Sequence, residues 1–71
     1  MLGKRLKEAR EAAGRSQADL AREVGVTPGA YSYFESGDRI PSLPVIKKIA
    51  RSLGVSIDHL VGLNLSNSKK G

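Results

Sequence analysis

The stretch that decides the fold is QADLAREVGVTPGAYSYFES, residues 17–36. It predicts two short helices joined at Gly25 and Val26, with the small residue Ala21 in the middle of the first helix. Gly25 ends that helix because glycine adopts the left-handed backbone conformation at little cost. The small side chain of Ala21 lets the second helix cross the first closely and at a steep angle. The sequence therefore predicts a helix-turn-helix over these residues.

Residues typical of helix starts mark both helices of this unit. Ser16 and Asp19 have the spacing of a capping box, in which Ser16 caps the helix and Asp19 reaches back to it. Thr27 is a good N-cap for the second helix, and Pro28 suits its first helical position. The inner face of the second helix is expected to carry Ala30, Tyr31 and Phe34.

Three further helices are predicted around this unit. The first covers residues 2–13, stops at Gly14 and carries the apolar stripe Leu2, Leu6, Ala9 and Ala13. Ser42 and Ser56 start a fourth and a short fifth helix, because serine hydroxyls cap helix N-termini. The apolar faces of these two helices carry Val45 or Ile46, Ile49, Ala50 and Leu53, and then Ile57, Leu60 and Val61. The predicted fold is all-α and compact, with five helices in residues 1–63, while residues 64–71 form a polar tail or a trimmed linker.

Length and composition exclude several classes of protein. A chain of 71 residues is one small domain, and its 0 cysteines exclude a disulfide framework or a thiolate zinc site. A single histidine excludes a histidine-pair metal site, and no apolar run approaches the roughly 18 residues of a membrane span. No nucleophile–base pair, carboxylate pair or glycine-rich phosphate loop has a recognisable spacing. We therefore expect a small binding module, not an enzyme, with no cofactor, metal, membrane or small-molecule partner.

The charge balance points to an anionic partner. The chain holds 12 Lys and Arg against 7 Asp and Glu, a net charge of +5, and its pI is about 10.0. A domain pI above about 9 is the electrostatic footprint of nucleic-acid binders, although many proteins that bind no anion share it. The basic residues gather in residues 1–15 and 38–63, on either side of a nearly neutral middle.

Several short stretches, in order along the chain, carry a family resemblance. They are LGKRLK at residues 2–7, SQADLA at 16–21, VGVT at 24–27, FESG at 34–37, PSL at 41–43 and LGVSID at 53–58. With them the chain resembles the lambda-repressor and Cro-type helix-turn-helix proteins, often called the xenobiotic-response-element (XRE) family. The resemblance spans about residues 2–63. It implies a lambda-repressor-like DNA-binding domain. The second helix of its helix-turn-helix, called the recognition helix, lies in the major groove.

The resemblance implies roles for individual residues. Gln17 matches a residue that grips a DNA phosphate, and helix N-termini offer N–H groups to anions in any case. Arg39, in the loop after the recognition helix, matches a position near the DNA backbone or minor groove. The positions that match the DNA-facing side of the recognition helix are Thr27, Pro28, Gly29, Ser32 and Tyr33. The alternative for this set is an ordinary exposed helix face.

Two further groups of charged residues have alternative interpretations. Arg10 and Glu35 match an ion pair that orients the first helix against the recognition helix, and Arg10 also matches a position near a phosphate. The other basic residues are either solvated or close to phosphates: Lys4, Arg5, Lys7, Lys47, Lys48 and Arg51.

The recognition helix departs from the pattern of a strong base reader. None of its DNA-facing positions carries Arg, Lys, Asn or Gln, the side chains that form bidentate bonds to purines. Tyr33 is the only large polar residue on that face, and Gly29 allows a close approach of the backbone. We therefore expect modest direct readout of bases, with phosphate contacts and DNA shape supplying much of the affinity. The same departures also suit a domain that keeps the fold without reading DNA.

Two functions follow as hypotheses. The first is a transcription regulator that binds double-stranded DNA sequence-selectively. It would be a repressor of bacterial or phage type that acts in the cytoplasm at the nucleoid. It would bind a pseudo-palindromic operator as a homodimer formed mainly on DNA, with contacts from Val61, Leu63 and Leu65. The alternative is a protein-interaction module of the antitoxin or co-activator bridging type with the same fold. It would bind a partner through its apolar C-terminal region and would bind DNA weakly or not at all.

Overall fold

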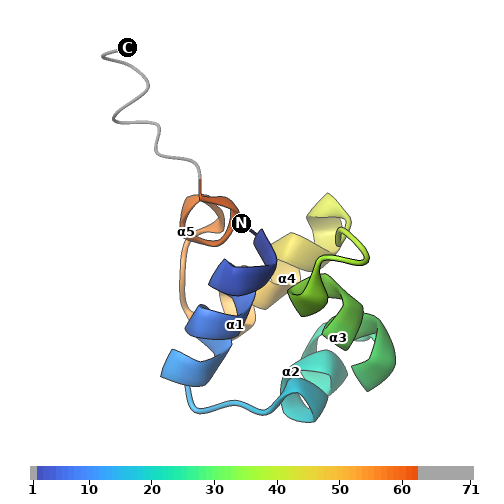
Figure 1. The fold of residues 1–71 in the computed structure, drawn as a ribbon. Helices are drawn as coiled ribbons and strands as arrows, with labels where there is room; N and C mark the ends of the chain where they lie inside the picture. The colour runs from blue at the N-terminus through green and yellow to red at the C-terminus, as the bar shows by residue number, and fades with distance from the viewer. Residues whose placement is uncertain (1, 63–71) are drawn as a thin grey trace, which may run out of the picture.

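The computed structural model describes residues 2–62 and contains five α-helices in that range (Figure 1). The helices are α1 (Leu2–Ala12), α2 (Gln17–Val24), α3 (Pro28–Ser36), α4 (Leu43–Leu53) and α5 (Ile57–Val61). The all-α prediction is confirmed, and so is each predicted helix. The predicted tail and the possible dimer contacts Leu63 and Leu65 lie outside the described residues.

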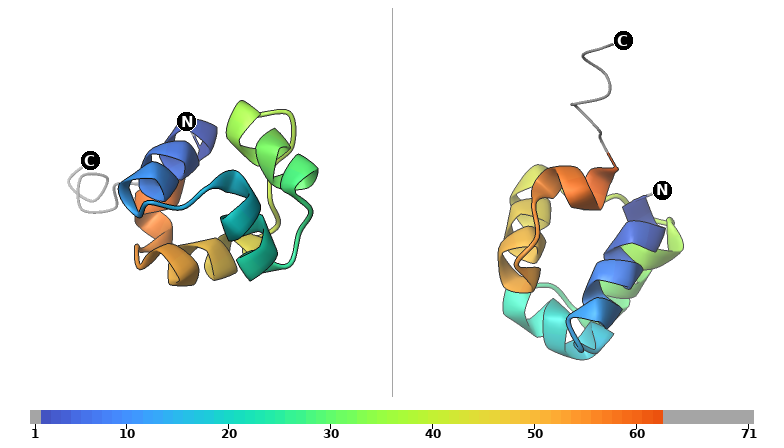
Figure 2. Two further views of the ribbon diagram at one scale, coloured as in Figure 1. Left: turned by 90° about the horizontal axis from the view of Figure 1, so that it is seen from below. Right: turned by 90° about the vertical axis from the view of Figure 1, so that its left-hand side faces the viewer.

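The helices surround one shared core. α1 packs against α3 and α5, α4 packs against α2 and α5, and α2 packs against α3. In the right-hand view of Figure 2, α1 and α4 run along two sides, while α5 and α2 cross at opposite ends. Each helix contributes one large apolar or aromatic side chain with no exposed surface: Leu6, Leu20, Tyr31, Ile49 and Leu60. The buried Ala21 lies where α2 and α3 pack together, as the sequence predicts.

The predicted caps fix where the helices begin and end. The side-chain oxygens of Ser16, Thr27, Ser42 and Ser56 each accept a hydrogen bond from the backbone N–H three residues on. α2 and α3 then end at Gly25 and Gly37, whose φ values of 82° and 90° lie in the left-handed region. Only half of the predicted capping box at α2 forms, because the Asp19 carboxylate lies 3.5 Å from Arg22 Nη1 instead of reaching back.

One position on the first helix was predicted wrongly. Ala13 is exposed and lies beyond the end of α1, although the spacing placed it on the buried stripe. The chain leaves the helix at Ala12 and turns through Gly14, whose φ is 72°. The apolar stripe therefore stops at Ala9, and the next buried position on α1 is Arg10.

Two kinds of feature are absent from residues 2–62, a membrane-spanning helix and a metal-binding cluster. None of the helices there is long and apolar enough to cross a membrane. The same residues contain no group of three or more His, Cys, Asp or Glu side chains placed to hold a metal ion.

Candidate nucleic-acid interface

The outer face of α3 is the first component of the candidate interface. Pro28 and Gly29 are exposed, Tyr33 is 47% exposed and Ser32 is half-buried. Thr27 is exposed as well, but its Oγ1 accepts a hydrogen bond of 3.1 Å from Ala30 N as the cap of α3. The outer face therefore presents a short polar surface with little side-chain bulk at its N-terminal end.

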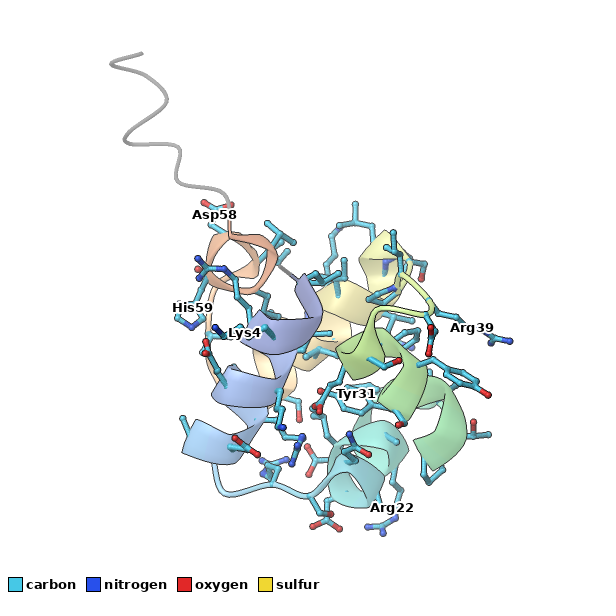
Figure 3. The ribbon with its side chains drawn as sticks, viewed as in Figure 1. Lys4, Arg22, Tyr31, Arg39, Asp58 and His59 are labelled. Carbon is cyan, nitrogen blue, oxygen red and sulfur yellow. The ribbon has the colours of Figure 1, made fainter. Side chains whose placement is uncertain are left out.

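The inner face of α3 anchors the helix in the core. Tyr31 and Phe34 are buried, and their rings meet edge to face with centroids 6.0 Å apart. Figure 3 shows Tyr31 inside the fold on the α1 side of α3. The Tyr31 hydroxyl has no hydrogen-bond partner among the described residues. Burial, together with the negative charge of Glu35 nearby, raises the pKa of this phenol.

Gln17 lies where the start of α2 meets the end of α3. Its side chain is directed at Glu35, with Nε2 donating a hydrogen bond of 2.9 Å to Oε1 of that carboxylate. An amide nitrogen carries two N–H groups, so one remains for a further acceptor. The residue expected to grip a phosphate is therefore held in place by α3. This bond has no signature in the sequence, because the partners are 18 positions apart.

Arg10 and Glu35 form a two-point ion pair between α1 and α3. Arg10 Nε lies 2.6 Å from Glu35 Oε2, and Arg10 Nη2 donates to Oε1 at 3.2 Å. Arg10 Nη1 also donates to the backbone oxygen of Arg15 at 2.8 Å. The side chains of Arg10 and Glu35 are only 11% and 5% exposed, so the guanidinium is enclosed and forms its bonds within the protein. This geometry fits the structural role of Arg10 better than a phosphate contact.

The pair shifts the titration of both groups. Burial raises the pKa of Glu35, but hydrogen bonds from Arg10 and Gln17 act in the opposite direction, and the net effect lowers it. The hydrogen bond to Glu35 likewise raises the pKa of Arg10 against the opposing effect of burial. Both groups are therefore charged in the folded state near neutral pH.

Arg39 is the basic residue next to the outer face of α3. It is exposed in the loop after the helix, and its guanidinium makes no hydrogen bond or ion pair to the described residues. The guanidinium carbon lies 5.3 Å from the centroid of the Tyr33 ring. Figure 3 shows Arg39 projecting outward from the fold beside α3. The structure thus brings together two of the predicted DNA-facing residues.

Several other basic side chains are engaged elsewhere. Arg5 Nη1 donates to the backbone oxygen of His59 at 3.5 Å, and Arg15 pairs with Glu23. In Figure 3, Lys4 points toward the α5 side of α1, away from Arg39. Lys47, Lys48 and Arg51 are exposed on α4. The described basic residues therefore do not all gather on the outer face of α3.

Two exposed apolar residues were not singled out from the sequence. Ile40 is 81% exposed in the loop after α3, and Leu43 is 56% exposed at the start of α4. The expected dimer contact Val61, by contrast, is half-buried and packs against the core. The loop before α4 therefore offers more free apolar surface than the end of α5 does within the described residues.

The fold agrees with a comparison against known protein families. The sequence pattern of the family described as helix-turn-helix matches residues 6–60. The chain belongs to the Cro/CI-type helix-turn-helix family. This is a family of DNA-binding transcription regulators and not of enzymes.

Individual members of the helix-turn-helix family support this assignment. The cryptic phage CTXphi transcriptional repressor RstR of Vibrio cholerae serotype O1 is 40% identical over 58 residues, 82% of this chain and 52% of the repressor. Multiprotein-bridging factor 1 of Schizosaccharomyces pombe is 32% identical over 66 residues, 92% of this chain and 45% of the factor. The chain thus spans about half the length of these curated relatives.

A solved structure gives the same fold. SinR, the master regulator for biofilm formation, was crystallised in complex with DNA and superposes with a TM-score of 0.80 at 32% identity. The match covers 86% of this chain and 98% of the SinR chain. The five-helix Cro/CI-type architecture predicted from the sequence is therefore confirmed.

Proposed function

We propose that this domain binds double-stranded DNA sequence-selectively as part of a transcription regulator, specifically a repressor. The observation that carries the proposal is the two-sided character of α3. Its inner face is fixed by Tyr31 and Phe34 in the core, while its outer face is exposed between Gln17 and Arg39. RstR is a repressor and SinR was crystallised with DNA, which supports the same function here.

The proposed mechanism places α3 in the major groove. Pro28 and Gly29 have little side-chain volume, so the N-terminal end of α3 can approach the base edges closely. Gln17 donates its remaining N–H to a phosphate, assisted by the positive end of the α2 dipole. Tyr33 supplies the one large polar side chain that contacts the bases. Most of the affinity then comes from the DNA backbone and DNA shape.

Repression follows when a dimer covers an operator and blocks the polymerase. One such domain contacts a half-site, and two half-sites are read about 34 Å apart on one face of the duplex. Val61 is a candidate dimer contact, as are Leu63 and Leu65 in the part of the chain that is not described. We propose that this dimer forms on DNA. The protein would then be a bacterial or phage-type regulator that acts at the nucleoid.

Selection of bound duplexes from a random library tests the proposal. The selection is carried out near physiological salt and repeated at several salt concentrations, because phosphate contacts make the affinity fall as salt rises. A symmetric motif and a steep salt dependence are the expected results. Recovery of no sequence above background from folded protein would reject sequence-selective binding.

Two variants then separate the roles of Gln17 and Tyr33. Gln17→Ala is expected to weaken binding to every duplex by about the same factor, because a phosphate contact carries no sequence information. Tyr33→Ala is expected to reduce discrimination among duplexes, by up to roughly tenfold for one base contact. An unchanged sequence preference in Tyr33→Ala would remove Tyr33 from the base-reading set.

A second candidate function rests on the exposed pair Ile40 and Leu43. These side chains are 81% and 56% exposed, and one relative is named a multiprotein-bridging factor. In this alternative the domain binds a protein partner through the loop before α4. The double variant Ile40→Ser with Leu43→Ser should then abolish capture of that partner, whereas a DNA-binding domain would keep its duplex affinity within about twofold.

A further inference from the structure

Arg39 is folded back toward α3 by its own backbone. After the left-handed turn at Gly37, Arg39 N donates a hydrogen bond of 3.2 Å to the backbone oxygen of Tyr33. The same oxygen accepts a hydrogen bond of 3.1 Å from Gly37 N. Two backbone donors on one carbonyl fix the position of the loop relative to the last turn of α3. The backbone therefore holds Arg39 close to Tyr33 even before the side chains interact.

The Arg39 guanidinium then lies over the ring of Tyr33. The Arg39 guanidinium carbon lies 5.3 Å from the Tyr33 ring centroid, inside the range of a cation–π contact. Tyr33 is 47% exposed, so part of its side chain remains available to a partner. Arg39 is exposed as well.

The nearest acidic residue does not neutralise this arginine. Asp38 precedes Arg39 in the chain, but its Oδ2 accepts a hydrogen bond of 2.8 Å from Ser36 Oγ. No ion pair between Asp38 and Arg39 forms in residues 2–62. Arg10, Arg15 and Arg22, by contrast, each pair with a carboxylate. Within residues 2–62 the Arg39 guanidinium makes no hydrogen bond or ion pair, so its N–H donors are available to an external anion while the group lies over an aromatic ring.

We propose that Tyr33 and Arg39 act as one phosphate-binding unit, in which the Tyr33 ring orients the Arg39 guanidinium toward a DNA phosphate at the C-terminal end of α3. Tyr33 is then a positioning residue through its ring and a base-contacting residue through its hydroxyl. A guanidinium held over an aromatic ring is preorganised, so it loses less side-chain freedom on binding than a free arginine does. This inference rests on the proposed DNA-binding function.

The proposal predicts how three single variants and one double variant behave with a duplex of about 20 base pairs carrying the selected half-sites. Arg39→Ala should reduce the slope of log affinity against log salt by about 0.9 for each bound domain, the loss of one phosphate contact per half-site. Tyr33→Leu should reduce affinity by about two- to fivefold and reduce the slope as well. Measured against Tyr33→Phe, which already lacks the hydroxyl, the losses in Tyr33→Leu and Arg39→Ala should not multiply in the double variant. Tyr33→Phe, which keeps the ring, should keep the wild-type slope.

A measurement without DNA checks the contact itself. Proton chemical shifts of the Arg39 side chain should carry a ring-current shift in the wild type and in Tyr33→Phe. That shift should vanish in Tyr33→Leu. Thermal unfolding of each variant shows whether the fold is kept, and both positions are exposed enough that no core packing is removed.

The outcomes separate the inference from the proposed function. An unchanged salt slope in Tyr33→Leu, or losses that multiply in the double variant, would overturn the coupling while leaving DNA binding intact. A wild-type chain that binds no duplex would overturn the proposed function and the phosphate role together. Reduced slopes in Tyr33→Leu and Arg39→Ala, with the slope restored by Phe at position 33, establish the unit.

Discussion

At the scale of single residues, Glu35 is where three helices are joined. Its carboxylate belongs to α3 and accepts hydrogen bonds from Arg10 on α1 and from Gln17 on α2. Desolvation offsets much of the attraction in such a buried pair, so the intact pair contributes little net stability. Loss of one partner is costly, because the other charge is left buried without compensation.

The pH dependence of the free energy of unfolding reflects the protonation of the Glu35 carboxylate. The folded-state pKa of Glu35 lies below its ordinary value of 4.5, so the folded state favours the charged form. Its contribution is fully present above pH 4.5 and is lost as the pH falls through the folded-state pKa. We therefore expect Glu35→Gln to lower the free energy of unfolding by about 3 kcal/mol at pH 7. Urea unfolding at pH 3 should show a smaller difference from the wild type.

Glu8→Gln is the matched control for this experiment. Glu8 is exposed on α1 and forms no ion pair in residues 2–62, so the same chemical change should alter stability by less than about 0.5 kcal/mol. An equal difference between wild type and Glu35→Gln at pH 7 and pH 3 would contradict the assigned role of the carboxylate.

At the scale of elements, the close approach of α1 to the end of α3 depends on Gly3. A Cβ atom at this position would lie 2.9 Å from the carbonyl carbon of Glu35 and 3.0 Å from the backbone oxygen of Phe34. It would lie closer still to the backbone oxygen of Glu35. These are backbone atoms, which cannot rotate away as a side chain can. The absence of a side chain at Gly3 therefore sets the spacing between the two helices.

Gly3→Ala should separate the two helices and destabilise the domain. Overpacking of this kind lowers the free energy of unfolding by about 1–3 kcal/mol. The loss should appear as a lower midpoint of thermal or urea unfolding. Gly29→Ala provides the contrast, because a Cβ there meets no atom within 4 Å. In α3 that change should raise stability by about 0.5–1 kcal/mol. Equal stability changes in the two variants would argue against the close contact at Gly3.

Local chemistry made the elements predictable, while contacts between distant residues escaped prediction. Ser16, Thr27, Ser42 and Ser56 gave correct helix starts, because capping depends on residues only three positions apart. Ala13 was placed wrongly because periodicity alone does not show where a helix stops.

The same distinction holds for the candidate interface. The inward face of α3 followed from spacing, whereas the outward positions and the Arg10–Glu35 pair followed from the family resemblance. The bond from Gln17 to Glu35 and the contact of Arg39 with Tyr33 depend on how helices and loops meet in space. Neither has a pattern in the sequence that would predict it.

At the scale of the whole molecule, the core makes the domain a single cooperative unit. Each helix supplies one fully buried large side chain, and α5 supplies Leu60. A chain of this size has a thin stability margin, so the loss of one such contact affects every helix. Even the five-residue α5 is therefore part of the fold and not an appendage.

Leu60→Ala should test this cooperativity. Truncation of a fully buried leucine costs about 2–5 kcal/mol, so the unfolding midpoint should fall steeply. Helical circular dichroism and the tyrosine environment should be lost in one shared transition. Val61→Ala, at the half-buried neighbouring position, should have a smaller effect. Loss of α5 alone, with the other helices intact, would show that the core is divided.

The placement of the two tyrosines has an optical consequence. The chain contains 2 tyrosines and 0 tryptophans, so its near-ultraviolet fluorescence comes from these two phenols. Tyr31 is enclosed in the core, whereas Tyr33 is half exposed beside Arg39. One emission signal thus combines a reporter of folding with a reporter of the outer face of α3. Tyr33→Phe isolates the first reporter and Tyr31→Phe the second, so unfolding and ligand binding can be followed without an attached dye.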